Sequence, residues 1–161
     1  MAEDRAGPVG PDPVRHGPLP PVLFLGALVV QGAGHFLFPV LRVIPNPWNL
    51  GGVVLIVAGL GVVVVADLQF TRAKTTVHPF KESTALVTTG IFGFTRNPMY
   101  LGMVTILFGV AVTVGTLTAF LVPPLFGWVL SAGQIRMEEE RLIRVFGSAY
   151  TVYAQRVRRW L

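Results

Sequence analysis

The chain has 161 residues, of which 52% are hydrophobic and 13% charged, and its net charge at pH 7 is +5. Soluble domains carry about 25% charged residues, so this composition excludes an ordinary water-soluble globular protein. The chain has no cysteine, which excludes disulfides, thiolate metal sites and a cysteine nucleophile. Its three histidines stand in separate segments, so the sequence predicts no metal site.

Charged residues avoid two long stretches of the chain. Residues 20–70 contain only Arg42 and Asp67, and residues 98–134 contain none. A helix needs about 20 apolar residues to cross a bilayer, so each stretch can hold two crossings. The sequence therefore predicts an all-α integral membrane protein with four transmembrane helices, at about residues 21–40, 50–69, 98–114 and 117–133.

Basic residues are concentrated on two of the segments that flank these spans. The connector between the first two spans carries only Arg42, and the connector between the last two carries no base. This asymmetry follows the positive-inside rule and predicts that both termini and the 70–97 loop are cytoplasmic, in a cell inner membrane. We attribute the net positive charge to this topology and to anionic lipid headgroups, and we expect no nucleic acid partner. The bases concerned are Arg72, Lys74, Lys81 and Arg96, and after the fourth span Arg136, Arg141, Arg144, Arg156, Arg158 and Arg159.

Residues 1–19 are rich in proline and glycine and show no apolar periodicity, which predicts a disordered cytoplasmic tail. Residues 20–161 would then form a single membrane domain. In the first span, Gln31 and His35 share one helix face, and we expect them to hydrogen-bond a neighbouring helix. A functional role remains the alternative for such intramembrane polar groups.

Small residues in the second span predict a close approach to another helix. They are Gly52, Ala58, Gly59 and Gly61. Residues 70–97 form a long loop, which is rich in Thr, Val, Leu and Phe and is therefore expected to fold back over the cytoplasmic mouth of the bundle.

Asn97-Pro98 predicts the start of the third span, with Asn97 as the N-cap and Pro98 as the first helical residue. The free N–H groups and positive dipole end of that helix would attract an anion. Pro123-Pro124 predicts a kink in the fourth span. The pattern then becomes amphipathic from Gln134, and we expect Gly147 to end that helix and Ser148 to cap another. Tyr150, Tyr153, Val157 and Trp160 form a stripe at helical spacing, which indicates packing.

The run Glu138-Glu139-Glu140 is divided by helix geometry. Glu138 and Glu139 lie on the two edges of the apolar face, while Glu140 points away from it and has arginines at both i±4 positions, Arg136 and Arg144. A carboxylate beside a buried stripe is costly unless it is paired. We therefore expect Glu138 and Glu139 each to need a polar or charged partner, and Glu140 to form surface ion pairs.

Two blocks of sequence together resemble one enzyme family. The first is the run LVTTGIFGFTRNPMYLG at residues 86–102, and the second is the pattern EExxLxxxFGxxYxxY at residues 138–153. They are similar to the signature of the isoprenylcysteine carboxyl methyltransferases and related phospholipid methyltransferases, which are integral-membrane enzymes. The resemblance implies that residues 20–161 form a membrane methyltransferase domain that uses S-adenosyl-L-methionine bound at a cytoplasmic loop and the C-terminal amphipathic helices.

The resemblance also implies roles for individual positions. Asn97 replaces the usual histidine of the family and cannot act as an acid or base near neutral pH. Phe92 stands where some relatives have tyrosine. Arg136 and Glu139 are the candidates for substrate binding and catalysis, although the register of Arg136 is inexact. The implied cofactor-binding residues are Thr84, Ala85, Leu86, Val87, Phe92, Asn97, Pro98, Met99, Tyr100 and Glu138.

The expected reaction is methyl transfer to a lipophilic or small acceptor at the cytoplasmic membrane face. A prenylated carboxylate, a phospholipid amine and a thiol all remain open as acceptors, and so does the oligomeric state. An amine acceptor must lose a proton, for which Glu138, Glu139 and His78 are the candidates. Two other functions remain as alternatives, an NADPH-dependent membrane reductase of the sterol-reductase type and a non-catalytic membrane protein with the same fold.

Overall fold

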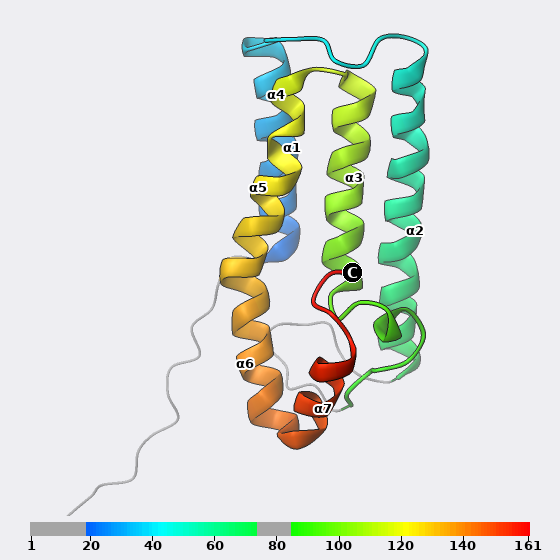
Figure 1. Ribbon diagram of the computed structural model, residues 1–161, viewed down its shortest axis with the longest axis vertical. Coiled ribbons are helices and arrows are strands. Elements are labelled where there is room, and N and C mark those ends of the chain that lie inside the picture. Colours follow the sequence, from blue (N-terminus) through cyan, green and yellow to red (C-terminus); the bar gives the residue numbers. More distant parts are fainter. Residues whose placement is uncertain (1–18, 74–84) are drawn as a thin grey trace, which may run out of the picture.

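The computed structural model describes residues 19–73 and 85–161. The described residues form long helices that stand side by side (Figure 1). An isolated β-bridge joins Arg42 to Thr116. Most of the expected N-terminal tail, residues 1–18, lies outside the described residues, as do residues 74–84 of the long loop with Thr84 and His78.

Four long helical segments make up the bundle. The fourth is a continuous rod of shorter elements, which passes through the π-helical turn η3 before it reaches α6. The elements are α1 (Pro20–Leu37), η1 (Trp48–Leu50), α2 (Gly51–Arg72), η2 (Gly90–Gly93), α3 (Pro98–Val114), α4 (Leu117–Phe120), α5 (Val122–Val129), η3 (Leu130–Gln134), α6 (Ile135–Phe146) and α7 (Ser148–Arg156).

Three of the described helices are long and apolar enough to cross a bilayer: α1, the segment Trp48–Arg72 and the rod Leu117–Phe146. The outward faces of α1 and α2 carry exposed apolar side chains such as Val29 and Val54, which suits contact with lipid. Helix α3 has 17 residues and is the shorter apolar helix of the bundle. The described residues therefore have the fold of an all-helical membrane protein.

Helices α2 and α3 are packed through glycines. A Cβ atom placed on Gly59 would lie 2.7 Å from the carbonyl oxygen of Gly102, and one on Gly109 would lie 2.7 Å from that of Gly52. Only glycine permits such backbone contact, so Gly52 and Gly59 have the predicted packing role. For Gly61 the prediction is wrong, because open space surrounds it. Exposed Ala58 likewise faces away from the helix contact.

Gln31 and His35 join α1 to its neighbours, as expected from their shared face. The Gln31 amide donates to the carbonyl oxygens of Leu107 (2.9 Å) and Ala119 (3.0 Å). The His35 Nδ1 atom lies 3.2 Å from the hydroxyl of Thr116. These contacts confirm the packing interpretation, since each satisfies a polar group that would otherwise be costly in a bilayer.

The fourth rod departs from the predicted span in two ways. The helix is interrupted at Leu121, and Pro123 lies in the first turn of α5, where a missing N–H is tolerated. The predicted span and the amphipathic helix expected after it are also not separated, because the rod runs on through η3 into α6. Helix α6 ends at Phe146, directly before Gly147, as predicted. Gly147, with φ +53°, then reverses the chain. The prediction that Ser148 caps α7 is wrong, because Ser148 is its first helical residue and no side chain caps the helix.

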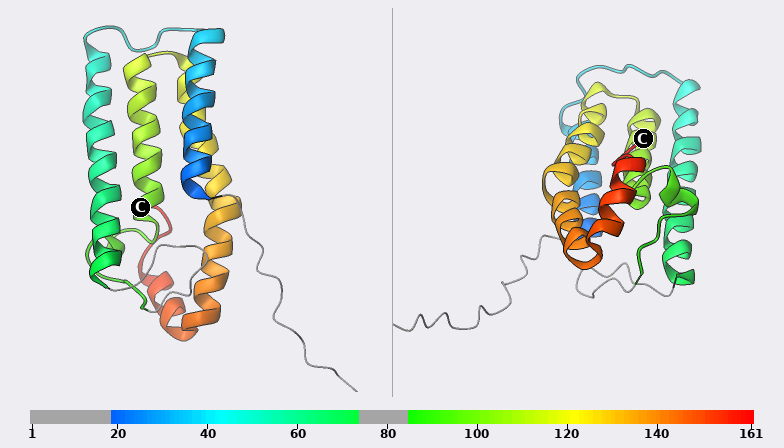
Figure 2. Two further views of the ribbon diagram at one scale, coloured as in Figure 1. Left: turned by 180° about the vertical axis from the view of Figure 1, so that it is seen from behind. Right: turned by 60° about the horizontal axis from the view of Figure 1, so that its bottom comes forward.

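The start of α1, the end of α2, the start of α3, α6 and α7 all lie at the same end of the bundle (Figures 1 and 2). At this end Tyr150, Tyr153 and Val157 form a small core against Leu86 and Leu142. This core fixes the described part of the α2–α3 connector, residues 85–97, against α6 and α7. The segments that carry the motif residues are thereby brought together.

Candidate functional site

A cavity of about 460 Å³ opens between the start of α3, residues 85–97, α6 and α7. This volume falls within the range of about 300–1,000 Å³ that is typical of small-molecule sites. The cavity is lined by Leu19, Pro20, Pro21, Phe70, Ala85, Leu86, Val87, Phe92, Arg96, Asn97, Pro98, Met99, Tyr100, Met103, Glu138, Glu139, Arg141, Leu142, Tyr150 and Tyr153.

The start of α3 forms one wall of the cavity. Pro98 is the first helical residue, as predicted, and Asn97 occupies the N-cap position. The Asn97 side chain does not cap the helix, however, and its amide nitrogen donates to the carbonyl oxygen of Arg159 (2.9 Å). Thr95 donates to the same oxygen (3.2 Å). The sequence prediction of a capping side chain is therefore wrong: Asn97 binds the C-terminal segment of the chain.

Glu138 faces Tyr100 across the cavity end of the bundle. The Tyr100 hydroxyl donates to Glu138 Oε1 at 2.5 Å, and the amide of Gln134 donates to the same oxygen at 3.0 Å. Gln134 comes from the π-helical turn, a form of helix that is frequent at functional sites. Both hydrogen bonds fall on Oε1, which leaves Oε2 outside them, on a carboxylate that lines the cavity.

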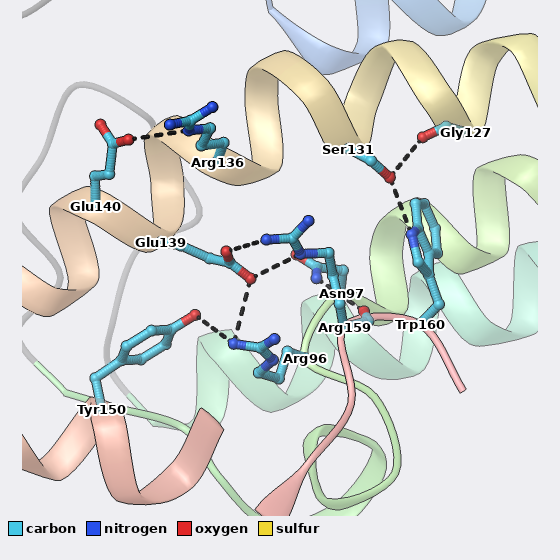
Figure 3. A network of polar contacts seen from close by, with 10 residues as sticks. All are labelled: Arg96, Asn97, Gly127, Ser131, Arg136, Glu139, Glu140, Tyr150, Arg159 and Trp160. Carbon is cyan, nitrogen blue, oxygen red and sulfur yellow. Dashed lines mark hydrogen bonds and ion pairs between the residues drawn. The ribbon is translucent and has the colours of Figure 1, made fainter. Parts of the chain in front are cut away.

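Glu139 forms the charged wall with two arginines from distant segments (Figure 3). Arg159 contacts both carboxylate oxygens, from Nε at 3.0 Å and from NH2 at 2.5 Å. Arg96 NH1 lies 3.2 Å from Oε1. The hydrogen bond with Glu139 raises the pKa of Arg159 above its usual value, so this guanidinium stays charged. One carboxylate is therefore held by two cations.

Two tyrosines of α7 complete the wall opposite α3. The Tyr153 hydroxyl donates to the carbonyl oxygen of Phe92 (2.7 Å), and Arg96 donates to the Tyr150 hydroxyl (3.4 Å). Burial raises the pKa of Tyr153 to about 12. Burial, and secondly the charge of Glu139, raise the pKa of Tyr150. Both phenols are thus protonated near neutral pH and serve as hydrogen-bonding groups.

The structure brings together all of the predicted site residues that it describes, with one exception. Arg136 lies on the outer face of α6, with its side chain 74% exposed, and pairs with Glu140 at 3.4 Å. That pair was expected for Glu140, and it holds Arg136 away from the cavity lining. Thr84 lies outside the described residues.

Sequence reasoning missed several residues of this site. Arg96 adjoins the Asn-Pro pair, and its charge in an apolar stretch was an available signal. Tyr150 and Tyr153 were assigned to packing alone, although both also line the cavity. Arg159 gave no signal, because its role depends on the return of the chain from α7 to α3, which no local pattern encodes.

The cavity combines separated charges with apolar surface. Arg96 and Arg141 supply cationic groups, and Glu138 supplies a carboxylate, while Met103 and Leu142 are among the apolar residues. A ligand that fits this arrangement carries an anionic group, a cationic or N–H donor group and an apolar or aromatic body. No group of three or more His, Cys, Asp or Glu side chains within residues 19–73 and 85–161 is placed to hold a metal ion.

Comparison with known proteins gives a family. The family model described as phospholipid methyltransferase matches residues 48–149, which is more than half of the chain and runs from η1 into α7. No curated protein matches the chain. The matched region contains the start of α3, Glu138 and Glu139, so it includes most of the cavity wall. The chain belongs to the phospholipid methyltransferase family, and it is a membrane methyltransferase by that membership.

Proposed function

We propose that the protein transfers a methyl group from S-adenosyl-L-methionine to a lipophilic acceptor at the cytoplasmic face of the membrane. The observation that carries this proposal is the meeting of two distant blocks, residues 85–100 and Glu138, on one cavity of ligand size. The family match supplies the reaction class. The exposed apolar faces of α1 and α2 suit contact with lipid, which supports a lipophilic acceptor.

The residues of the cavity fit the charges of S-adenosyl-L-methionine. Arg96 offers guanidinium N–H groups to a carboxylate, and its Nε is buried without a partner among the described residues. Glu138 offers carboxylate oxygen to an ammonium group. Phe92 and Leu86 offer apolar surface to a nucleoside. The cationic and anionic groups belong to different residues of the lining, so they orient the ligand as well as bind it.

The cofactor, when bound, supplies an electrophilic methyl group on a sulfonium. The protein's task is to hold a nucleophile in line with that methyl, since a reaction of this kind gains mainly from positioning. A carboxylate or thiolate acceptor needs no base. A phospholipid amine, the acceptor class that the family name favours, must lose a proton to a base before or during the transfer.

The two carboxylates are proposed to have different roles. Glu139 is held by Arg96 and Arg159, so its charge is committed and it is poorly suited to accept a proton. Glu138 is held by two neutral donors, Tyr100 and Gln134, and remains available to a ligand. We therefore assign ligand binding to Glu138 and a structural ion pair to Glu139, and we leave Arg136 outside the site.

The proposed orientation places the cavity in the cytoplasm. Helix α3 would be the fourth crossing, because its 17 residues reach the lower limit of about 17–25 for a membrane helix. Arg72 at the end of α2, Arg96 on the cavity wall and the arginines of α6 and α7 lie at the cavity end of the bundle, and the positive-inside rule supports a cytoplasmic position for that end. S-Adenosyl-L-methionine is made there.

Isothermal titration of the detergent-purified protein with S-adenosylhomocysteine and with NADPH tests the proposal. We expect saturable binding of S-adenosylhomocysteine and no binding of NADPH. Binding of NADPH alone would support the reductase alternative and contradict the proposal. Binding of neither ligand by a folded, monodisperse sample would indicate a non-catalytic protein.

A further inference from the structure

The last residues of the chain form a strap across the start of α3. The C-terminal strap, Val157–Leu161, leaves α7 and runs between α3 and the rod (Figures 2 and 3). Its backbone is fixed where the Arg158 carbonyl oxygen accepts from the Arg96 backbone N–H (3.0 Å). At its far end the Trp160 indole donates to Ser131 (3.0 Å) and packs against the apolar core. The strap is thus tied down on both sides.

The strap delivers the Arg159 side chain to Glu139. The carbonyl oxygen of Arg159 accepts hydrogen bonds from both Asn97 and Thr95, and these bonds fix the position of the Arg159 backbone. Its guanidinium then contacts both oxygens of Glu139, the bidentate arrangement that is strongest between arginine and a carboxylate. Arg159 itself does not line the cavity, whereas Glu139 and Arg96 do.

The two arginines share Glu139 unequally. Arg96 reaches only Oε1, at 3.2 Å, while Arg159 occupies both oxygens. Two guanidinium charges against one carboxylate charge leave the group with a net charge of +1. Arg96 and Glu139 are well buried, with side chains 15% and 16% exposed, so this charge is poorly screened by water. Without Arg159, the cavity wall would be a neutral one-to-one pair of Arg96 and Glu139.

We propose that Arg159 is a positioning residue that satisfies Glu139 from behind the cavity wall and so leaves the positive charge of Arg96 for an anionic group of the ligand. Under the proposed function, on which this inference rests, that group is the carboxylate of S-adenosyl-L-methionine. Asn97 acts in the same way at one step removed, because it holds the Arg159 backbone.

The test compares two ligands that differ by one carboxylate. Titrations use S-adenosylhomocysteine and its decarboxylated analogue, which keeps the amine and the nucleoside. Arg159→Gln should weaken S-adenosylhomocysteine about tenfold, because Glu139 then neutralises Arg96. The affinity for the analogue should change less than about twofold, since the analogue has no carboxylate to bind Arg96.

The double variant Arg159→Gln with Glu139→Gln separates this role from a merely structural one. With both charges removed, no carboxylate at position 139 neutralises Arg96. The affinity for S-adenosylhomocysteine should therefore recover to within about threefold of the wild type. A structural role predicts that the second substitution adds damage. Arg156→Gln is the matched control, because it removes one exposed arginine charge at the end of α7 and should leave both affinities unchanged.

Thermal unfolding in detergent shows which variants are folded before they are titrated. If Arg159→Gln does not fold, Arg159→Lys replaces it, since lysine keeps the charge but loses the bidentate geometry. It should weaken S-adenosylhomocysteine by about threefold and the analogue less. A double variant that binds no better than Arg159→Gln, or equal losses for both ligands, overturns the inference. Failure of the wild type to bind S-adenosylhomocysteine overturns the proposed function and the inference with it.

Discussion

Buried polar side chains lie at both ends of the bundle, but they are satisfied in different ways. At the end away from the cavity, Gln31 and Asn49 donate to backbone carbonyl oxygens of neighbouring helices, and His35 meets a threonine hydroxyl. At the cavity end, Arg96 and Glu139 belong to a charged cluster that shares its partners. Neutral side chains thus join the helices at the end away from the cavity, whereas charged side chains form a cluster at the cavity end.

The difference shows how a polar residue in a membrane protein can be assigned. A neutral side chain whose hydrogen bonds all go to backbone atoms contributes about 0.6–2 kcal/mol to helix association. A charge costs more to bury and is retained where a partner or ligand repays it. The surplus of cation over carboxylate around Glu139, and the Oε2 of Glu138, which has no hydrogen bond within residues 19–73 and 85–161, are the features on which the proposed site rests.

The largest effect is expected from removing the charge of Glu138. Glu138→Gln should weaken S-adenosylhomocysteine binding by about 1.5–3 kcal/mol, because a charged acceptor of ligand hydrogen bonds is lost. Isothermal titration measures the loss. The thermal unfolding midpoint should change little, since glutamine can still accept from Tyr100. An unchanged affinity in the folded variant would remove Glu138 from the site.

The glycine contact between α2 and α3 should affect stability but not binding. Gly109→Ala places a Cβ atom 2.7 Å from the Gly52 carbonyl oxygen, so the helices must separate. We expect a loss of about 1–3 kcal/mol in the free energy of unfolding, measured by denaturant titration in detergent. Gly61→Ala, in open space, is the matched control. Equal stability of the two variants would contradict the close helix contact.

Gln31→Leu tests the other side of the comparison. The substitution removes the two hydrogen bonds that join α1 to the backbone of α3 and α4. Interhelical hydrogen bonds in membrane proteins contribute little, so we expect the free energy of unfolding to fall by about 0.6–1.7 kcal/mol. Thermal unfolding in detergent should show this loss, while the affinity for S-adenosylhomocysteine stays the same. A loss of affinity without a loss of stability would make Gln31 functional and would break the division between the two ends.

The smallest effects are expected at the exposed pair on α6. Arg136→Gln and Glu140→Gln should each change stability by a few tenths of a kcal/mol and leave ligand binding unchanged, because the pair is exposed to solvent. Titration of these variants and of Glu138→Gln with S-adenosylhomocysteine compares exposed and cavity-lining residues of the same helix, α6. A strong effect of Arg136→Gln would support the substrate-binding role that the family resemblance implied.

Local signals predicted much of the fold. Pro98 and Gly115 bound α3 at the predicted residues, since proline is favoured at a helix start and Gly115 adopts the left-handed conformation with φ +71°. The amphipathic helix expected from Gln134 ends before Gly147, as predicted, but the structure joins it to the fourth span as one rod, Leu117–Phe146. The change from apolar to polar residues there marks a change of surroundings, and helix propensity continues through it.

The site was predictable where helix geometry decides and unpredictable where distant segments meet. The 100° spacing of residues separated Glu138 from Glu140 correctly. The bidentate partner of Glu139 could not be foreseen, because Arg159 reaches it only after the chain reverses at Gly147 and returns to α3. Asn97 followed the rule for helix caps in position but not in bonding: its side chain makes no cap hydrogen bond and donates to the carbonyl oxygen of Arg159, a partner that no local pattern encodes.

Photocrosslinking with S-adenosyl-L-methionine labelled on its methyl group tests the proposed cofactor site most directly. The purified protein is irradiated with the ligand, with and without excess S-adenosylhomocysteine, and the labelled peptides are mapped by mass spectrometry. We expect protectable labelling within residues 85–103 or 138–153, which line the cavity. Protectable labelling confined to residues 24–37 of α1 or to the first half of α2, which do not line the cavity, would place the cofactor elsewhere and contradict the assignment.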